Sequence, residues 1–410
     1  MSFSRSAAAS PPAESDSNTP SPPEFPEGGL QAWAAVAGAA LVQFCGFGFG
    51  VYQDFYTRDY LSNSSSSSIA WIGSGLISGP LFDRGHFRTL VYGGCLIQSF
   101  SLFMLSLCKR QQYYQASASA WSTSPSIAVL SHYFRRRRAL AMTIAASGSS
   151  LGATVHPIML NNTFDKLGFG NAVRASAGMI SALLLVVCLI MRPRLPPAEG
   201  RRSVLRAVPR FARDGAYVFA VLGYSTWWRE MSLTEICRMA FYNIGFYFLV
   251  IMNGASFFGV SPPASSRTNS ASSTSSAHQR AFGTVLIFCV IALKTVASVV
   301  TIGVLYGYSV VTMMAPLLTV LTDDMGELGL RMGLGFSVVG IAGLIGPPIN
   351  GALLTSRYIW WRPALFSGIM ALVGFGFLLA TVFAFRRKMR VRREGEIGKT
   401  ETGNQEKGAA

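Results

Sequence analysis

The chain has 410 residues, half of them hydrophobic and only 13% charged, and its formal net charge is +16. An ordinary soluble domain carries roughly 25% charged residues, so the composition argues against a soluble globular protein. The positive charge is spread over the gaps between apolar runs and forms no single basic domain, which argues against a nucleic-acid-binding protein.

The first 29 residues are rich in Ser, Pro and Glu, which predicts a disordered cytosolic tail without a secretory signal. Long apolar runs follow this tail. Most of the runs approach or exceed the roughly 20 residues that an α-helix needs to cross a bilayer. In chain order the runs span residues 30–51, 90–107, 139–160, 172–191, 241–260, 282–321, 332–354 and 364–385. They lack the strict alternation of barrel strands, so they predict an all-α membrane protein.

Four segments are weak where alternation between the two sides of the membrane requires a crossing. Residues 69–82 are short, residues 113–130 are diluted by polar side chains, residues 216–224 form an apolar stub, and residues 261–276 are Ser-rich. Two explanations stay open: shortened helices embedded among their neighbours, or a gene model in which exons are lost or misjoined. We therefore expect roughly ten to twelve transmembrane helices, some of them truncated.

Basic residues gather in every second gap, which the positive-inside rule places in the cytosol together with both termini. These gaps contain Arg84, Arg88 and the basic stretches 135–138, 192–213 and 386–393. Asn63 and Asn161 begin the only two N-x-S/T triplets, and both lie in gaps assigned to the outside, so they are candidate N-glycosylation sites. The pattern fits a multi-pass protein, and we expect the plasma membrane.

The same pattern divides the chain into five parts. They are the tail 1–29, an amino-terminal helix bundle 30–192, a basic cytosolic linker 193–215, a carboxyl-terminal bundle 216–385 with a Ser-rich loop 261–276, and a basic cytosolic tail 386–410. A weak repeat supports two pseudo-symmetric bundles, because Arg138 and Arg331 each open a Gly-rich helix that ends at proline. These would be helices five and eleven, and the two halves would rock around a midplane cavity.

The most specific local pattern lies between the second and third apolar segments, where residues 79–88 read GPLFDRGHFR. It resembles the signature loop of the major facilitator superfamily, and the resemblance selects a conformational gate made of Gly79, Asp83, Arg84, Gly85 and Arg88. A glycine permits close helix contact, and the aspartate can face the amino terminus of a neighbouring helix. The alternative is a charged turn that only follows the positive-inside rule.

Two further motifs resemble the monocarboxylate porters, in particular the fungal branch of that family. Residues 27–33 read EGGLQAW before the first helix, and residues 132–141 read HYFRRRRALA before the fifth. The likeness extends over most of the chain. Val260 stands where the family usually has an arginine, and the first helix has no lysine, so proton-coupled monocarboxylate transport cannot simply be carried over.

Polar side chains within the apolar segments are the candidate transport residues, because ionisable groups are costly in lipid. Lys294 interrupts the longest apolar run and could attract an anion, or could snorkel to an interface. His156 could carry a proton, or could be a hydrogen-bonded or solvated histidine near the external end. Asn253 and Ser256 could line a polar cavity, or Asn253 could make an interhelical hydrogen bond.

No enzyme motif occurs in a suitable context, and we expect no enzyme, no cofactor and no metal site. Residues 398–400 resemble the end of a P-loop, but Arg393 stands where its first glycine belongs. The six cysteines form no C-x-x-C pair or metal-like cluster with histidine, and they are predicted to be unpaired, buried packing residues.

Three functions remain open from the sequence. The first is a secondary transporter of the monocarboxylate-porter type that moves a small organic acid or secondary metabolite by alternating access, with efflux slightly favoured. Its partners would be the small-molecule substrate, membrane lipid and a proton as the candidate coupling ion, and no nucleic acid. The second is a proton-linked monocarboxylate uptake permease. The third, of another class, is a non-transporting sensor or an inactive relative.

Overall fold

The structure is a computed structural model, and every regular element among the residues it describes is a helix. The described residues are 27–46, 78–107, 125–134, 137–194, 204–228, 245–259, 281–289, 295–309, 314–322, 324–354 and 361–409. The helices of the first half are α1 (Leu30–Gly46), α3 (Ser78–Asp83), α4 (Phe87–Leu105), η3 (Val129–His132) and α6 (Arg138–Ile190). Those that follow are α7 (Val204–Ala212), α8 (Gly215–Trp228), α10 (Gly245–Gly259), α12 (Val296–Ser309), α13 (Met314–Leu321), η5 (Met325–Glu327), α14 (Leu328–Leu354) and α15 (Trp361–Ala409).

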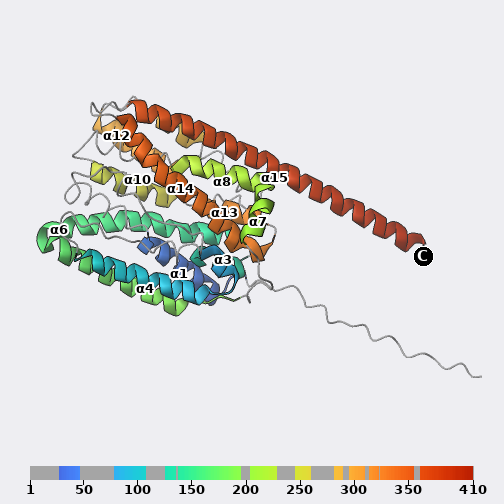
Figure 1. The fold of residues 1–410 in the computed structure, drawn as a ribbon, viewed down its shortest axis with the longest axis horizontal. Helices are drawn as coiled ribbons and strands as arrows, with labels where there is room; N and C mark the ends of the chain where they lie inside the picture. Colours follow the sequence, from blue (N-terminus) through green and yellow to red (C-terminus); the bar gives the residue numbers. More distant parts are fainter. Residues whose placement is uncertain are drawn as a thin grey trace, which may run out of the picture.

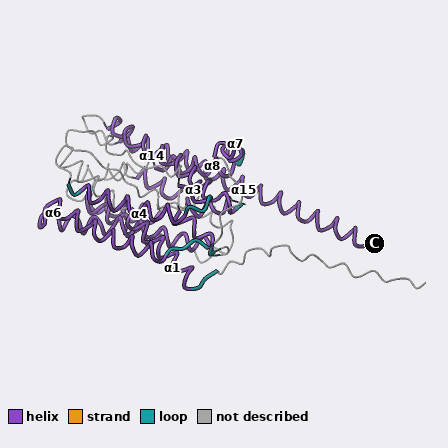
Figure 2. The backbone as a smooth tube through the Cα atoms, turned by 60° about the horizontal axis from the view of Figure 1, so that its bottom comes forward, coloured by secondary structure: helices purple, strands orange, loops and turns teal. Residues whose placement is uncertain are grey.

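The helices form two adjoining groups, one from each half of the sequence (Figures 1 and 2). In the amino-terminal half, α6 packs against α1 and α4, and in the carboxyl-terminal half, α8 packs against α14 and α15. The halves meet where α6 contacts α10 and α13, and where α3 contacts α14. One hydrophobic cluster of buried side chains extends through both halves, so the interface between them is part of the core.

The surface of the helices carries large apolar side chains that a soluble protein would bury. Leu96 is 73% exposed and Phe383 is 67% exposed, and many more are exposed by over a third. Such a surface is stable only against an apolar environment such as lipid. Cys289 is also exposed, which contradicts the prediction that the cysteines are buried. The physical reason is that a thiol is apolar enough to face lipid. The four cysteines among the described residues are free, as predicted.

The helix lengths bear on the number of membrane crossings. Among the helices that the structure describes, three stretches are long and apolar enough to cross a membrane: Lys166–Ile190, Trp361–Gly395 and Val296–Leu321. The last of these also spans residues 310–313, which lie outside the described residues. Three more are apolar but shorter: Leu30–Gly46, Val250–Gly259 and Leu328–Ala342. Residues 69–77, 113–124 and 261–276 of the weak segments lie outside the described residues. The number of crossings, and whether the short helices are truncated, therefore stays a prediction.

α6 differs from the two separate helices that the sequence predicted over residues 139–160 and 172–191. The structure is helical from Arg138 to Ile190 and leaves helical geometry at Gly168, with φ 72° and ψ 162°. Only glycine adopts this left-handed region without a steric cost, so the chain can turn sharply there. The expected gap between the two helices is reduced to a corner in α6 (Figure 1).

The carboxyl-terminal segment, expected as a separate tail from residue 386, continues α15 without a break to Ala409. This part of α15 projects beyond the two groups of helices (Figure 1). The linker 193–215 likewise contains a helix, α7. α3, α7 and α13 lie at the end of the molecule from which α15 projects, and we call this the basic end.

Two glycines of α6 allow it to approach α1 closely. A Cβ at Gly148 would meet the backbone carbonyl of Ala40, and one at Gly152 would meet that of Phe44. The four-residue spacing of small side chains is typical of helix contacts in membranes. Because the neighbouring atoms are backbone, a larger side chain could fit only if one helix moved.

Replacing Gly152 with Ala is expected to destabilise the protein by about 1–3 kcal/mol, because the added methyl group forces α6 away from α1. Gly178 in the second arm of α6 is the matched control, because nothing lies within 4 Å of its Cβ position. Alanine is favoured over glycine in a helix, so G178A should keep or slightly raise stability. Thermal unfolding of the two purified variants in detergent tests the contact, and equal losses would contradict it.

Candidate gate at the basic end

An aspartate from one half binds the start of a helix in the other half. α3 ends at Asp83, and the turn that follows has Gly85 at φ 84°, a conformation that favours glycine. The Asp83 carboxylate accepts hydrogen bonds from the backbone N–H groups of Gly329 (3.0 Å to Oδ1) and Leu330 (2.7 Å to Oδ2). We call this contact the latch, because it joins α3 to the first turn of α14.

The latch has a clear physical basis. The first N–H groups of an α-helix have no carbonyl partner within the helix, and the aligned peptide dipoles make this end partly positive. A carboxylate accepts hydrogen bonds from these N–H groups, and its negative charge is attracted to the partly positive helix end. Hydrogen bonds to an ionised acceptor are also stronger than those between neutral groups. Of the other residues in the predicted gate, Gly79 lies within α3, and Arg84 and Arg88 are exposed.

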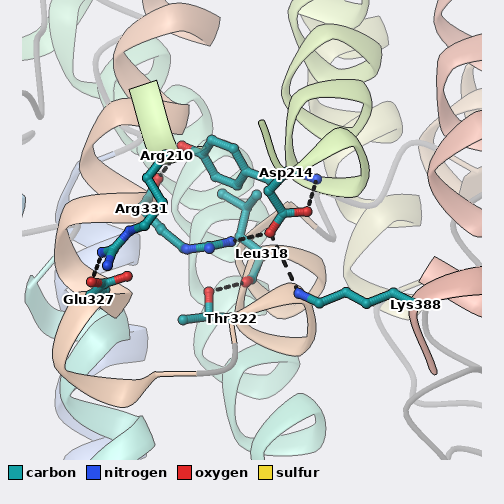
Figure 3. Close-up of polar contacts among 8 residues, drawn as sticks. Arg210, Asp214, Leu318, Thr322, Glu327, Arg331 and Lys388 are labelled. Carbon is teal, nitrogen blue, oxygen red and sulfur yellow. Dashed lines mark hydrogen bonds and ion pairs between the residues drawn. The ribbon is translucent and has the colours of Figure 1, made fainter. Parts of the chain in front are cut away.

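Arg331 lies one residue beyond the latch and is held on several sides (Figure 3). Its guanidinium donates to the Asp214 carboxylate at 2.9 Å, and both side chains are largely buried, with 9% and 14% exposed. The guanidinium carbon also lies 4.6 Å from the ring centroid of Phe211 and 5.4 Å from that of Tyr217. The Tyr217 hydroxyl donates to the Arg331 carbonyl at 2.8 Å. These contacts fix the first turn of α14 against α7 and α8.

Two further ion pairs surround Arg331 at the basic end. The Lys388 ammonium from α15 lies 3.6 Å from the Asp214 carboxylate, so Asp214 faces two cations. Arg210 from α7 pairs with Glu327, just before α14 (Figure 3). Glu327 is buried, whereas Arg210 is largely exposed. The first turn of α14 is therefore connected through charges to α7, α8 and α15.

Deeper contacts between the halves lie along α6. The Thr319 hydroxyl of α13 donates to the Met142 sulfur of α6 at 3.2 Å, and both residues are buried. The Ser256 hydroxyl of α10 donates to the Ser150 hydroxyl of α6 at 2.6 Å. The halves are thus in contact at the latch and at these two places along α6.

The two motifs at residues 27–33 and 132–141 lie against each other. The Glu27 backbone N–H donates to the Tyr133 carbonyl at 3.2 Å, and the Glu27 carboxylate accepts from the backbone N–H of Arg137 at 3.1 Å. The rings of Trp33 and Phe134 make an edge contact with centroids 5.5 Å apart. Glu27, three residues before α1, is therefore bound to the start of α6 in the same half.

His132 connects this region to the gate motif. Its ring lies against Phe82 of α3, with centroids 5.6 Å apart. Burial lowers the pKa of His132 to about 4, so the ring is neutral at physiological pH. A neutral His132 adds no positive charge at α3, and its ring packs against Phe82.

Two of the predicted transport residues, His156 and Ser256, lie in helix contacts. His156 is fully buried, and its Nε2 lies 3.2 Å from the Phe44 carbonyl of α1, so it is hydrogen-bonded and not solvated. Ser256 is buried at the α6 contact, and its hydroxyl lies 2.9 Å from the Asn253 carbonyl. Lys294 and Asn63 lie outside the described residues. Asn161 is exposed on α6, and its glycosylation stays a prediction.

Sequence reasoning missed Asp214, Tyr217 and Lys388. Asp214 had a usable signal, because an acidic residue and a glycine precede an apolar run there as they do at Glu27-Gly28. Lys388 had none, since it is one of six basic residues between positions 386 and 393. Among the described residues, no group of three or more His, Cys, Asp or Glu side chains could hold a metal ion.

The fold is that of a membrane transporter. Its structure aligns with the crystal structure of the human organic anion transporter MFSD10 (TETRAN), with a TM-score of 0.62 and 13% sequence identity, over 85% of this chain and 99% of that one. No protein-family model matches the chain. At such low identity the likeness shows the fold alone, and the family has to come from closer relatives.

The chain belongs to the major facilitator superfamily. It is 34% identical to the aspyridones efflux protein of Emericella nidulans, over 92% of this chain and 82% of that protein. It is 32% identical to an MFS-type transporter of the same fungus, with 86% of each chain covered. The fujikurins efflux protein of Gibberella fujikuroi is 31% identical over 90% of this chain and 86% of that protein. The chain is therefore a multi-pass integral membrane protein and a secondary transporter, and the specific likeness to monocarboxylate porters is not established by these relatives.

Proposed function

We propose that this transporter exports a fungal secondary metabolite or a similar small organic acid across the plasma membrane, with the latch as its cytosolic gate. The export direction is supported by the relatives named after the effluxed aspyridones and fujikurins, and by an agnestins efflux protein that is 32% identical. The positive-inside rule supports the cytosolic side, because the basic end carries the arginine-rich gaps.

The proposed gating mechanism depends on the latch. It is a charge-assisted contact between the two halves, and such a contact can form in one conformation and break in the other at moderate cost. With the latch closed, the halves touch at the basic end and also through the Met142–Thr319 and Ser150–Ser256 pairs. Rocking of the halves would break these contacts and open a path from the cytosol to a midplane cavity.

Export is tested in yeast cells that express the chain and are loaded with a panel of compounds. The panel contains aspyridones, fujikurins and agnestins, together with short monocarboxylates such as lactate. We expect at least one of the larger metabolites to leave the cells faster than from cells with an empty vector, measured by mass spectrometry of the medium. Accelerated uptake of lactate instead would support the monocarboxylate permease, and no movement of any compound by a correctly inserted protein would favour the inactive relative.

A further inference from the structure

An acidic residue precedes the first helix of each half and binds the start of that half's Gly-rich helix. In the amino-terminal half, the Glu27 carboxylate accepts from the backbone N–H of Arg137 at 3.1 Å, just before α6. In the carboxyl-terminal half, the Asp214 carboxylate accepts from the guanidinium of Arg331 at 2.9 Å, in the first turn of α14. α6 and α14 are the two helices that the internal repeat pairs. We call these contacts the Glu27 clasp and the Asp214 clasp.

The two clasps differ in their relation to the other half of the molecule. The start of α14 also binds Asp83, the last residue of α3 in the amino-terminal half. The corresponding segment after α10, residues 260–280, contains no Asp or Glu, so it offers no carboxylate to the start of α6. The Asp214 clasp thus lies next to a contact between the halves, and the Glu27 clasp connects parts of one half.

The geometry connects the Asp214 clasp directly to the latch. Gly329 and Leu330, whose N–H groups bind Asp83, are the two residues before Arg331. Asp214 holds the guanidinium of Arg331, and Tyr217, three residues after Asp214, holds its carbonyl. Asp214 is itself fixed, because its other oxygen accepts from the backbone N–H of Tyr217 at 3.4 Å. The orientation of the first turn of α14 is therefore set from α8.

We propose that Asp214 is a positioning residue for the latch: it holds Arg331 against α8 and so aims the N–H groups of Gly329 and Leu330 at Asp83. This inference rests on the proposed gate. Asp214 touches neither Asp83 nor the opposite half through its described contacts, and it acts through α14. The Glu27 clasp also joins a carboxylate to the start of a Gly-rich helix, here through a backbone N–H group, and both of its partners belong to one half, so it provides a control within the chain.

Hydrogen–deuterium exchange of the full-length chain in lipid nanodiscs tests the proposal at the backbone groups that it concerns. D83N removes the acceptor and should raise exchange over residues 328–331 roughly tenfold, the factor expected for a loss of about 1.4 kcal/mol. D214N should raise exchange in the same residues roughly threefold to tenfold. The double variant D83N/D214N should exchange there no faster than D83N, because a positioning residue has no effect once its latch is gone.

Two control variants separate positioning from general destabilisation. E27Q should raise exchange over residues 137–141 and leave residues 328–331 unchanged, and its effect should add to that of D83N. D214E keeps the carboxylate and should restore most of the protection at residues 328–331 that D214N loses. A purely structural role for Asp214 would instead raise exchange throughout α8 and α14.

Each outcome decides between the proposals. Additive effects of D83N and D214N at residues 328–331, or an effect of D214N spread over all of α8 and α14, would overturn the positioning role. Unchanged exchange in D83N would overturn the latch and the positioning role together. Failure of the transport assay with normal exchange results would instead count against the proposed substrates, and leave the positioning role standing.

Discussion

Asp83→Asn is expected to reduce export at least tenfold without unfolding the protein. The carboxylate accepts two backbone N–H groups at the partly positive start of α14. An asparagine keeps one acceptor oxygen, but it loses the charge and presents an NH₂ group to a second donor. The combined loss is about 1.4 kcal/mol, which shifts the balance between closed and open conformations roughly tenfold. A transporter that must visit both conformations slows when one is depleted in this way.

The measurement is the initial export rate from loaded cells, normalised to the amount of inserted protein. Asp324→Asn is the matched control, because Asp324 is an exposed carboxylate shortly before α14 that accepts from the N–H of Gly326 in its own turn at 2.9 Å. We expect D324N to keep more than half of the rate, since exposed local contacts contribute little. A D83N variant that exports at the D324N rate would show that the latch has no part in transport.

The latch illustrates what the sequence could and could not predict. The resemblance of residues 79–88 to the signature loop of the major facilitator superfamily was sufficient to expect a carboxylate near a helix amino terminus. The identity of that helix follows from the way in which the two halves pack, and Asp83 and Gly329 are 246 positions apart. Hydrophobic periodicity defines the helices and their membrane faces, but it does not define which turns of distant helices meet. The Asp214–Arg331 pair was missed for the same reason.

The transport residues show a second limit. The sequence marked His156 and Ser256 because polar groups are costly in lipid. The structure gives both of them partners on neighbouring helices, at the Phe44 carbonyl and the Ser150 hydroxyl. A buried polar group in a membrane protein needs such a partner whether or not it contacts a substrate. Polarity alone therefore could not separate residues that hold helices together from residues that bind cargo.

Arg331→Gln is expected to destabilise the protein by about 3 kcal/mol, because it leaves the largely buried Asp214 carboxylate without its closest cation. The 3.6 Å contact with Lys388 offsets part of this loss, which places the effect at the lower end of the range for broken buried pairs. Glutamine also loses the stacking of the guanidinium on Phe211 and Tyr217, worth about 1 kcal/mol. The readout is the thermal unfolding of purified protein in detergent.

Lys388→Gln and the double variant R331Q/D214N identify the cause of this loss. Lys388 binds the same carboxylate at a longer distance, and its side chain is 39% exposed, so K388Q should cost less than about 1 kcal/mol. If the uncompensated charge of Asp214 dominates, D214N in the R331Q background should recover stability, because it removes the buried carboxylate that R331Q leaves without its closest cation. If R331Q/D214N is less stable than R331Q, the packing of Arg331 on the two aromatic rings outweighs its charge. In that case the start of α14 is held mainly by the aromatic residues of α7 and α8, and the carboxylate of Asp214 contributes chiefly to its orientation.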